Sequence, residues 1–160
     1  MPSRIVEECI ELLKDKQLSI AFAESATAGR AIAEFSLVPR CGKVLTGSLV
    51  CYDADIKQQY LKVTEDLVDQ YTPESAEVTE AMARGLKDFI RSDIQVAITG
   101  LTTEGGSETP EKPVGTMFIH LLMKDKSVPV RAEFKGEPEA IVLQTVDLVA
   151  QTIADELKKS

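Results

Sequence analysis

Short apolar segments that alternate with helical patterns constrain the fold of this chain more than any other sequence feature. Residues 18–23, 44–52 and 94–98 are apolar runs with the length of buried strands, and they are too short to form buried helices. Segments with helical periodicity lie between them. This alternation favours a sheet with parallel strands, because a crossover helix returns the chain to the same end of the sheet.

The rest of the pattern completes this architecture. At Thr72, a capping hydroxyl precedes a proline and a glutamate, which is typical of a helix start. Residues 114–122 and 128–134 predict two strands that form a hairpin around residues 124–127. The sequence therefore predicts one α/β domain over residues 1–160, a three-layer α/β/α sandwich with a mixed sheet. The predicted helices begin at or just after Ser3, Arg30, Asp53, Thr72 and Glu137.

The charge and the residue content exclude several classes of function. A net charge of −8 repels phosphate groups, so we expect no nucleic-acid partner and no binding to anionic membranes. Three cysteines and one histidine, His120, cannot form a zinc site of ordinary composition. No apolar run approaches ~20 residues and no secretory signal is present, so we expect a cytoplasmic protein. Cys9 and Cys51 lie in apolar patterns and are expected to be buried.

The segment of residues 23–29 is the most suggestive of chemistry. It places Ser25 and Thr27 in a turn between a strand and a helix, at the end of a strand where α/β sheets bind their ligands. Amide groups at the start of that helix can stabilise an oxyanion or bind a phosphate. A serine or threonine at this position more often only caps the helix, and the residues alone favour capping.

A serine nucleophile requires a base. His120 lies in the middle of a predicted strand, and we expect it to be a packed or half-exposed strand residue rather than a member of a catalytic triad. Lys57 follows a strand by less than two helical turns, and a lysine can activate serine if its pKa falls by about three units. From the residues alone, a solvated helix lysine is the stronger interpretation. Tyr52 either orients such a pair or is an ordinary strand aromatic.

A glycine-rich loop follows the strand at residues 94–98. Its residues Gly100, Gly105 and Gly106 allow a ligand to approach the backbone closely. The loop fits neither the P-loop nor the dinucleotide-binding fingerprint, so this signal is weak by itself.

Several segments, in their order along the chain, resemble the CinA C-terminal domain family, the nicotinamide-nucleotide amidases. The family pattern Ala-Glu-Ser-Cys-Thr-Gly-Gly is similar to residues 23–29, and Tyr-Ser-Asn-Glu-Ala-Lys is similar to residues 52–57. The Ser-Gly-Ile-Ala-Gly-Pro loop and the Lys-Pro-Val-Gly-Thr segment after it are similar to residues 99–101 and 112–116. A Phe-x-Gly pattern corresponds to residues 134–136. The match covers essentially the whole chain.

The resemblance implies hydrolysis of the carboxamide of nicotinamide mononucleotide to nicotinic acid mononucleotide and ammonia, with no metal and no cofactor. By the same resemblance Ser25 would be the nucleophile, Lys57 its base and Tyr52 a helper. The partner is expected to be a small nucleotide or amide substrate, and the chain is expected to form a homo-oligomer. The substrate-binding residues expected are Thr27, Gly29, Gly47, Thr99, Gly100 and Thr102.

Departures from the family pattern leave alternatives open. Ala26 and Ala28 replace a cysteine and a glycine, and residues 102–104 replace the Gly-Pro of the third loop. Pro138 and Val142 stand where the family typically has arginines, which are suited to phosphate binding. The chain is then either an amidase for such nucleotides, an amidase for a substrate without phosphate, or a catalytically lapsed paralogue with a binding or regulatory role. Another cation at the pocket would restore a phosphate site, and the candidates are Arg30, Lys43 and Arg131.

Overall fold

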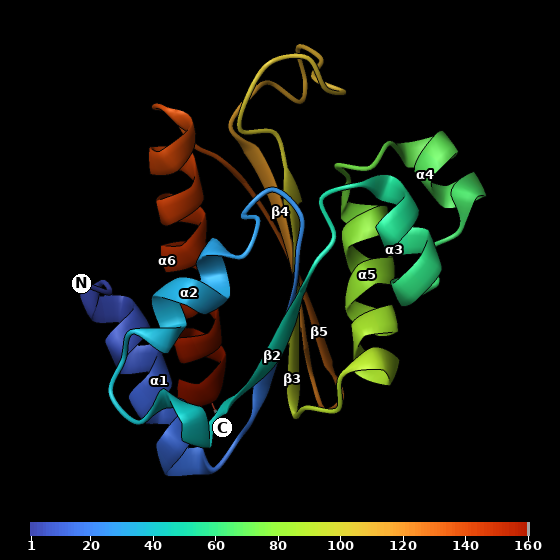
Figure 1. Cartoon of the computed structure of the whole chain (residues 1–160). Helices are drawn as coiled ribbons and strands as arrows, with labels where there is room; N and C mark the ends of the chain where they lie inside the picture. Colours follow the sequence, from blue (N-terminus) through green and yellow to red (C-terminus); the bar gives the residue numbers. More distant parts are fainter. Residues whose placement is uncertain (160) are drawn as a thin grey trace.

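A five-stranded mixed sheet forms the centre of the computed structural model, which describes residues 1–159 (Figure 1). Its strands lie in the order β2-β1-β3-β4-β5. Strands β2, β1 and β3 are parallel, whereas β4 pairs antiparallel with both β3 and β5. The predicted α/β fold with a mixed sheet is confirmed. The strands are β1 (Ile20–Glu24), β2 (Leu45–Val50), β3 (Ile94–Gly100), β4 (Thr116–Met123) and β5 (Lys126–Glu133).

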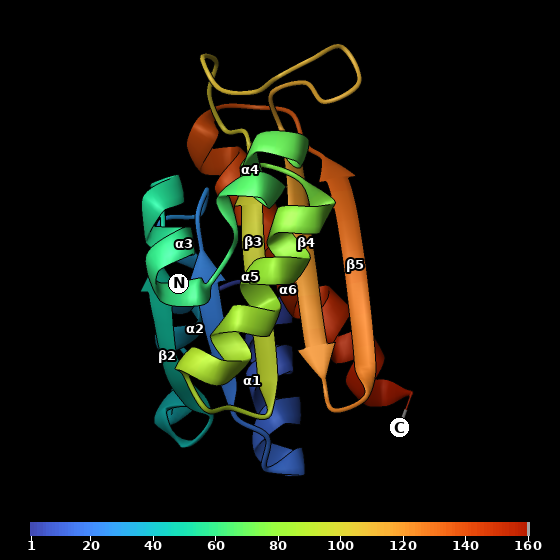
Figure 2. The ribbon, with the colours of Figure 1, turned by 90° about the vertical axis from the view of Figure 1, so that its right-hand side faces the viewer.

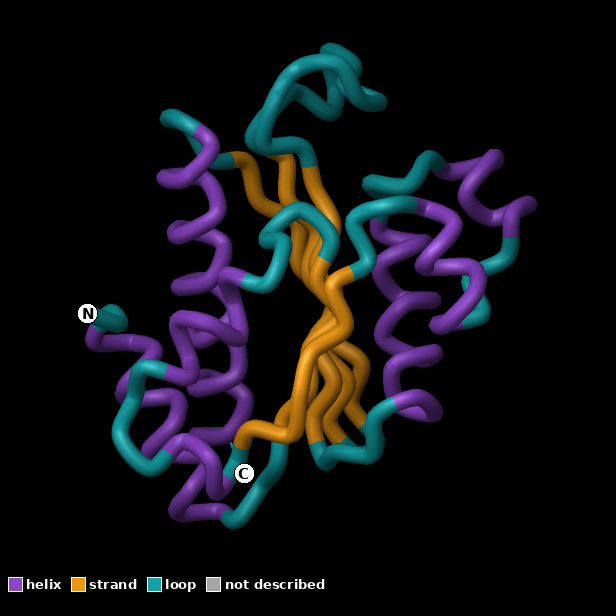
Figure 3. The backbone as a smooth tube through the Cα atoms, viewed as in Figure 1, coloured by secondary structure: helices purple, strands orange, loops and turns teal. Residues whose placement is uncertain are grey.

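Helices cover both faces of the sheet, which makes three layers (Figures 1 and 3). Helices α1, α2 and α6 lie on one face, and α3, α4 and α5 lie on the other. In residues 1–159, no helix combines the length and the apolar character needed to cross a membrane. The helices are α1 (Arg4–Lys16), α2 (Arg30–Ser36), the 3-10 helix η1 (Cys41–Lys43), α3 (Ala54–Leu61), α4 (Glu65–Tyr71), α5 (Ala76–Phe89) and α6 (Pro138–Lys158).

Neighbouring residues of the central strands pack into two separate cores. Phe22 of β1 meets Phe35 of α2 edge to face, with 5.1 Å between ring centroids, in the core under α1, α2 and α6. The next residue, Ala23, belongs with Ala97 of β3 and Leu86 of α5 to the core on the other face. This split follows from the strand period of two, which sends successive side chains to opposite faces.

Local capping decides where the helices begin. The Ser3 hydroxyl accepts a hydrogen bond from the Val6 amide, and the Asp53 carboxylate accepts one from the Asp55 amide, so the helix starts predicted at these two residues are confirmed. The helix start predicted at Thr72 is wrong. Helix α5 begins at Ala76, because the hydroxyl of its N-cap, Ser75, accepts from the third amide of the helix.

Thr72 instead ends α4, a short helix that the sequence pattern did not predict. Its backbone lies at φ 72° and ψ 157°, a region that residues with a side chain rarely adopt. The apolar pattern of α5, with Val78, Met82 and Leu86 buried, does not extend to Phe89. Phe89 is 48% exposed and packs edge to face on Tyr60 of α3 rather than on the sheet.

The predicted hairpin joins β4 and β5 through a turn at Lys124 and Asp125. Both strands begin and end within two residues of their predicted bounds. His120 is buried in β4 and pairs with the Ser127 hydroxyl at 2.6 Å, which confirms the predicted packing role. Burial lowers the pKa of His120. Cys9 and Cys51 are buried as expected.

The parallel strands bring three connections to one edge of the sheet. Because β1, β2 and β3 run in the same direction, their carboxyl ends lie together. Residues 25–29, 51–53 and 101–115 leave the strands there, and Figure 2 shows the last of these as a long loop beyond the sheet.

Candidate active site

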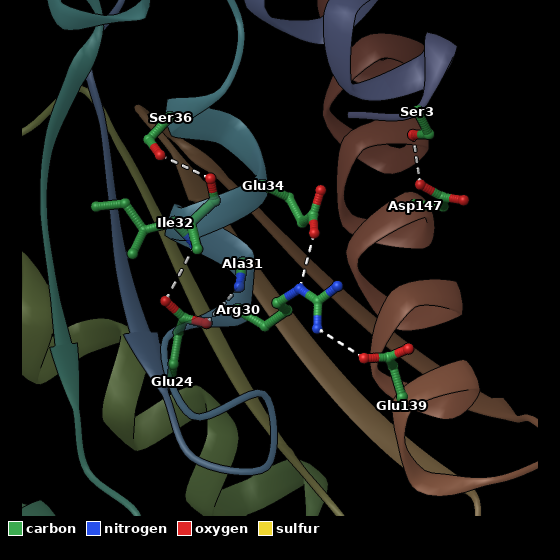
Figure 4. Close-up of polar contacts among 10 residues, drawn as sticks. Ser3, Glu24, Arg30, Ala31, Ile32, Glu34, Ser36, Glu139 and Asp147 are labelled. Carbon is green, nitrogen blue, oxygen red and sulfur yellow. Dashed lines mark hydrogen bonds and ion pairs between the residues drawn. The ribbon is translucent and has the colours of Figure 1, made fainter. Parts of the chain in front are cut away.

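A buried carboxylate organises the turn after β1. Glu24 accepts hydrogen bonds from the amides of Ala31 (2.8 Å) and Ile32 (3.2 Å), in the first turn of α2 (Figure 4). The hydroxyls of Thr27 and Ser48 donate to the same carboxylate at 2.7 and 2.8 Å. Glu24 therefore satisfies the amides at the start of α2, which otherwise would need a capping side chain or water.

The capping role expected of Ser25 or Thr27 is wrong, because Glu24 fills it. The Ser25 hydroxyl is therefore not needed to cap α2. The Ser25 amide extends the pairing with β3 by donating to the Ile98 carbonyl at 3.0 Å, which fixes its backbone. The side chain is 7% exposed, and within residues 1–159 its hydroxyl makes no hydrogen bond.

Ser25 lines a pocket of about 250 Å³ at the carboxyl edge of the parallel strands. Tyr52 and Glu74 form part of its wall, and the glycine-rich loop forms the rest. A larger hollow of about 460 Å³ lies at the opposite end of the sheet, around Ile94 and Met123. No hydroxyl or thiol lines that hollow among the described residues, so the smaller pocket is the candidate site. Its lining comprises Ser25, Ala26, Tyr52, Glu74, Gly100, Leu101, Thr102, Thr103, Glu104, Gly105 and Gly106.

Lys57 is almost completely buried, and its amine reaches Pro73, the residue before Glu74 of the pocket wall. It projects from α3 and is 1% exposed, so the interpretation as a solvated helix lysine is wrong. Burial lowers the pKa of its ammonium group, against the opposing influence of Cys51, Glu74 and Asp53. Its only hydrogen bond within residues 1–159 is a long one, 3.5 Å to the Pro73 carbonyl, and none joins it to Ser25.

A second lysine, Lys112, fixes the turn whose Pro73 carbonyl accepts the hydrogen bond from Lys57. Its ammonium group donates to the Thr72 hydroxyl (2.7 Å), the Glu74 carbonyl (2.8 Å) and the Ser107 hydroxyl (2.9 Å). Ser107 in turn donates to the Glu74 carboxylate at 2.5 Å. These bonds join the glycine-rich loop to the strained turn before α5, on which Pro73 and Glu74 lie.

The expected substrate-binding residues divide into two groups. Gly100 and Thr102 line the pocket, as do Ser25 and Tyr52 of the expected catalytic set. The hydroxyls of Thr27 and Thr99 instead bind inside the protein, the former to Glu24 and the latter to Thr79 at 2.8 Å. Gly29 is the N-cap of α2, and Gly47 lies within β2 opposite Ala21; neither is on the pocket lining.

The sequence matches a known family along nearly its whole length. The family model described as the CinA C-terminal domain aligns with residues 3–157. The chain belongs to the CinA C-terminal domain family. A CinA-like protein of Thermotoga maritima is 33% identical over 155 residues, which cover 97% of this chain and 38% of the relative. A CinA-like protein of Dictyoglomus thermophilum is 36% identical over 140 residues, which cover 87% of this chain and 34% of the relative. The chain thus spans well under half the length of these relatives.

Solved structures of CinA proteins share the fold. A CinA superfamily protein from Klebsiella pneumoniae 700603 superimposes with a TM-score of 0.92 at 21% identity, covering 98% of this chain and 97% of that chain. The competence/damage inducible protein CihA from Agrobacterium tumefaciens gives a TM-score of 0.90 at 22% identity, covering 99% and 98%. At these identities the likeness establishes the α/β architecture alone.

Sequence reasoning missed three residues of this CinA domain site: Glu24, Glu74 and Lys112. Glu24 and Lys112 lie inside family motifs that the chain retains. The motifs therefore pointed to these positions, but they did not reveal what the two side chains bind. Glu74 was noticed in the sequence only as an acidic residue of the helix start predicted at Thr72, and that prediction was wrong. Its place on the pocket wall depends on the turn that Lys112 holds.

Proposed function

We propose that this CinA domain is an amidohydrolase that cleaves a carboxamide C–N bond, with Ser25 as nucleophile and Lys57 as base. The observation that carries the proposal is a buried lysine of lowered pKa beside a pocket that contains a buried, unpartnered serine. Glu74 relates the two groups, because it lines the pocket with Ser25 and its charge acts on Lys57. Nicotinamide mononucleotide, which the family resemblance implies, is the reference substrate.

The proposed reaction has two halves. Neutral Lys57 takes the proton of the Ser25 hydroxyl as the oxygen attacks the carboxamide carbon. The tetrahedral intermediate collapses, the proton passes from Lys57 to the leaving nitrogen, and ammonia departs. Water then attacks the ester on Ser25 while Lys57 accepts a proton from it, and Lys57 returns that proton to the Ser25 oxygen as the acid product leaves. The long hydrogen bond to Pro73 costs little to break, so the Lys57 amine can turn toward Ser25.

Two amides without a hydrogen-bond partner are our candidates for stabilising the oxyanion of that intermediate. The backbone N–H groups of Ala26 and Thr27 make no hydrogen bond within residues 1–159. Ala26 directly follows Ser25 and lines the pocket. The amide after a nucleophilic serine is a common oxyanion donor, and losing one such donor costs roughly 10²–10³ in rate.

Ammonia release from nicotinamide mononucleotide and related carboxamides tests the proposal. Ser25→Ala and Lys57→Met are each expected to lower turnover about 10³-fold or more, because the nucleophile and its base act as a unit. Lys87→Met, which removes an exposed lysine of α5, is the matched control and should retain parental turnover. Thermal unfolding of each variant checks that the fold is intact.

The pH profile gives an independent measurement. Because the base must be neutral, kcat/KM should rise with pH through a pKa below that of an ordinary lysine. Retained activity in Ser25→Ala would exclude the serine mechanism. Absence of ammonia release by the parent protein with every carboxamide tested would instead indicate the lapsed paralogue.

A further inference from the structure

The pocket beside Ser25 is acidic. Glu74 and Glu104 line it, and none of its lining residues within 1–159 is a lysine, arginine or histidine. Glu24, the residue before Ser25, is buried, and the four hydrogen-bond donors to its carboxylate are amides and hydroxyls rather than cations. A substrate anion in this pocket would meet like charge.

None of the three cations named as candidates for a phosphate site lines the pocket. Arg30 pairs with Glu34 at 2.7 Å and with Glu139 of α6 at 3.3 Å (Figure 4). Lys43 lies beside a hollow at the opposite end of the sheet. The third, Arg131 of β5, lies over a phenylalanine ring and donates to a backbone carbonyl.

Neither of the two lysines near the pocket, Lys57 and Lys112, lines it. An ammonium group has three protons to donate, and Lys112 already has three oxygen acceptors, all from the protein. Lys57 is buried outside the pocket lining. Lys112 cannot donate to a phosphate without breaking the contacts that hold Thr72 and Glu74, and Lys57 acts in the proposed reaction as a neutral amine rather than as a cation.

The glycine-rich loop offers no vacant anion site either. The Gly105 amide donates to the Glu108 carboxylate at 2.8 Å. Hydrogen bonds from the amides of Glu108, Gly105 and Gly106 lower the pKa of this carboxyl group. The protein's own carboxylate thus occupies amides that line the pocket and that would otherwise suit a phosphate.

We propose that this pocket binds a carboxamide that carries a positive charge close to the amide and no phosphate group. The inference rests on the proposed function for the identity of the amide, and on Ser25, a mostly buried residue on the pocket lining whose hydroxyl makes no hydrogen bond within residues 1–159. An N1-substituted pyridinium carboxamide has this chemistry: its ring is cationic, and its nucleoside form lacks the phosphate. Opposite charge between ligand and pocket favours its binding, whereas a phosphate is repelled.

Two matched pairs of probes separate these effects. Nicotinamide riboside and nicotinamide mononucleotide differ by the phosphate, and N1-methylnicotinamide and nicotinamide differ by the positive charge. Calorimetric binding to Ser25→Ala measures preference without turnover, so failure of the amidase proposal is detected separately, by ammonia release from the parent. We expect the riboside to bind about tenfold more tightly than the mononucleotide, and the methylated amide about tenfold more tightly than nicotinamide.

Substitutions of single carboxylates test which charges cause the binding preferences among these probes. In the same Ser25→Ala background, Glu104→Gln should reduce the preference for the cationic probe, and Glu108→Gln should strengthen binding of the mononucleotide. Glu111→Gln removes an exposed carboxylate of the same loop outside the pocket and should change neither. Tighter binding of the mononucleotide than of the riboside, equal binding of the charged and neutral amides, or no binding of any probe at millimolar concentration would each overturn the inference.

Discussion

Replacing Glu24 by glutamine tests whether the buried carboxylate organises the turn that carries Ser25. One carboxylate oxygen accepts from the Ala31 amide and the Thr27 hydroxyl, and the other accepts from the Ile32 amide and the Ser48 hydroxyl. A glutamine retains one oxygen only. Its NH₂ group then faces a hydroxyl, which can rotate and accept, and a backbone amide, which cannot.

The magnitude follows from these contacts. One buried amide loses its acceptor, which costs roughly 1–3 kcal/mol, and the remaining bonds lose the strength that the negative charge adds, about 1 kcal/mol. We therefore expect Glu24→Gln to lower the free energy of unfolding by about 3 kcal/mol. For a domain of this size, that loss corresponds to a Tm lower by roughly 6–12 °C.

The assay is urea unfolding followed by circular dichroism, with Glu34→Gln as the matched control. Glu34 also lies at α2 and pairs with Arg30, whose side chain is 38% exposed (Figure 4). Losing that partly exposed ion pair should cost no more than about 1 kcal/mol. If Glu24→Gln destabilises the protein no more than Glu34→Gln does, the organising role of Glu24 is refuted.

Three further perturbations have defined outcomes. Gly85→Ala would place a Cβ 1.9 Å from a backbone carbonyl oxygen of α3 and should cost about 1–3 kcal/mol in urea unfolding, whereas Gly42→Ala, which meets no atom within 4 Å, should cost little. Lys57→Met should be more stable than the parent at neutral pH, because burial of the charged lysine destabilises the parent there. The lowered pKa of Lys57 makes the stability of the parent rise with pH, so the difference in Tm between variant and parent should narrow at alkaline pH. A difference in Tm that stays constant with pH would contradict this. Lys112→Met should speed amide hydrogen exchange in residues 101–115, and unchanged exchange would show that Lys112 does not hold the loop.

Local signals in the sequence predicted much of the fold. Ser3 and Asp53 cap their helices through amides two or three residues away, so the pattern contains the whole interaction. The start predicted at Thr72 used the same kind of signal and was wrong. The conformation of Thr72 depends on Lys112, 40 residues further along the chain, whose ammonium group holds the threonine hydroxyl and the Glu74 carbonyl. No short-range pattern records such a partner.

The candidate site also combines features that the sequence predicted with features that only the tertiary structure determined. The motifs alone marked Ser25, Lys57 and Tyr52, because strand ends and the helices after them can be read from residue type and spacing. Only the tertiary structure decided that Lys57 is buried and that the hydroxyl of Ser25 is left without a partner while Glu24 caps α2. Burial and hydrogen-bond partners depend on which distant segments pack together, and the order of the strands, which brings those segments to one edge of the sheet, is set by the assembled core.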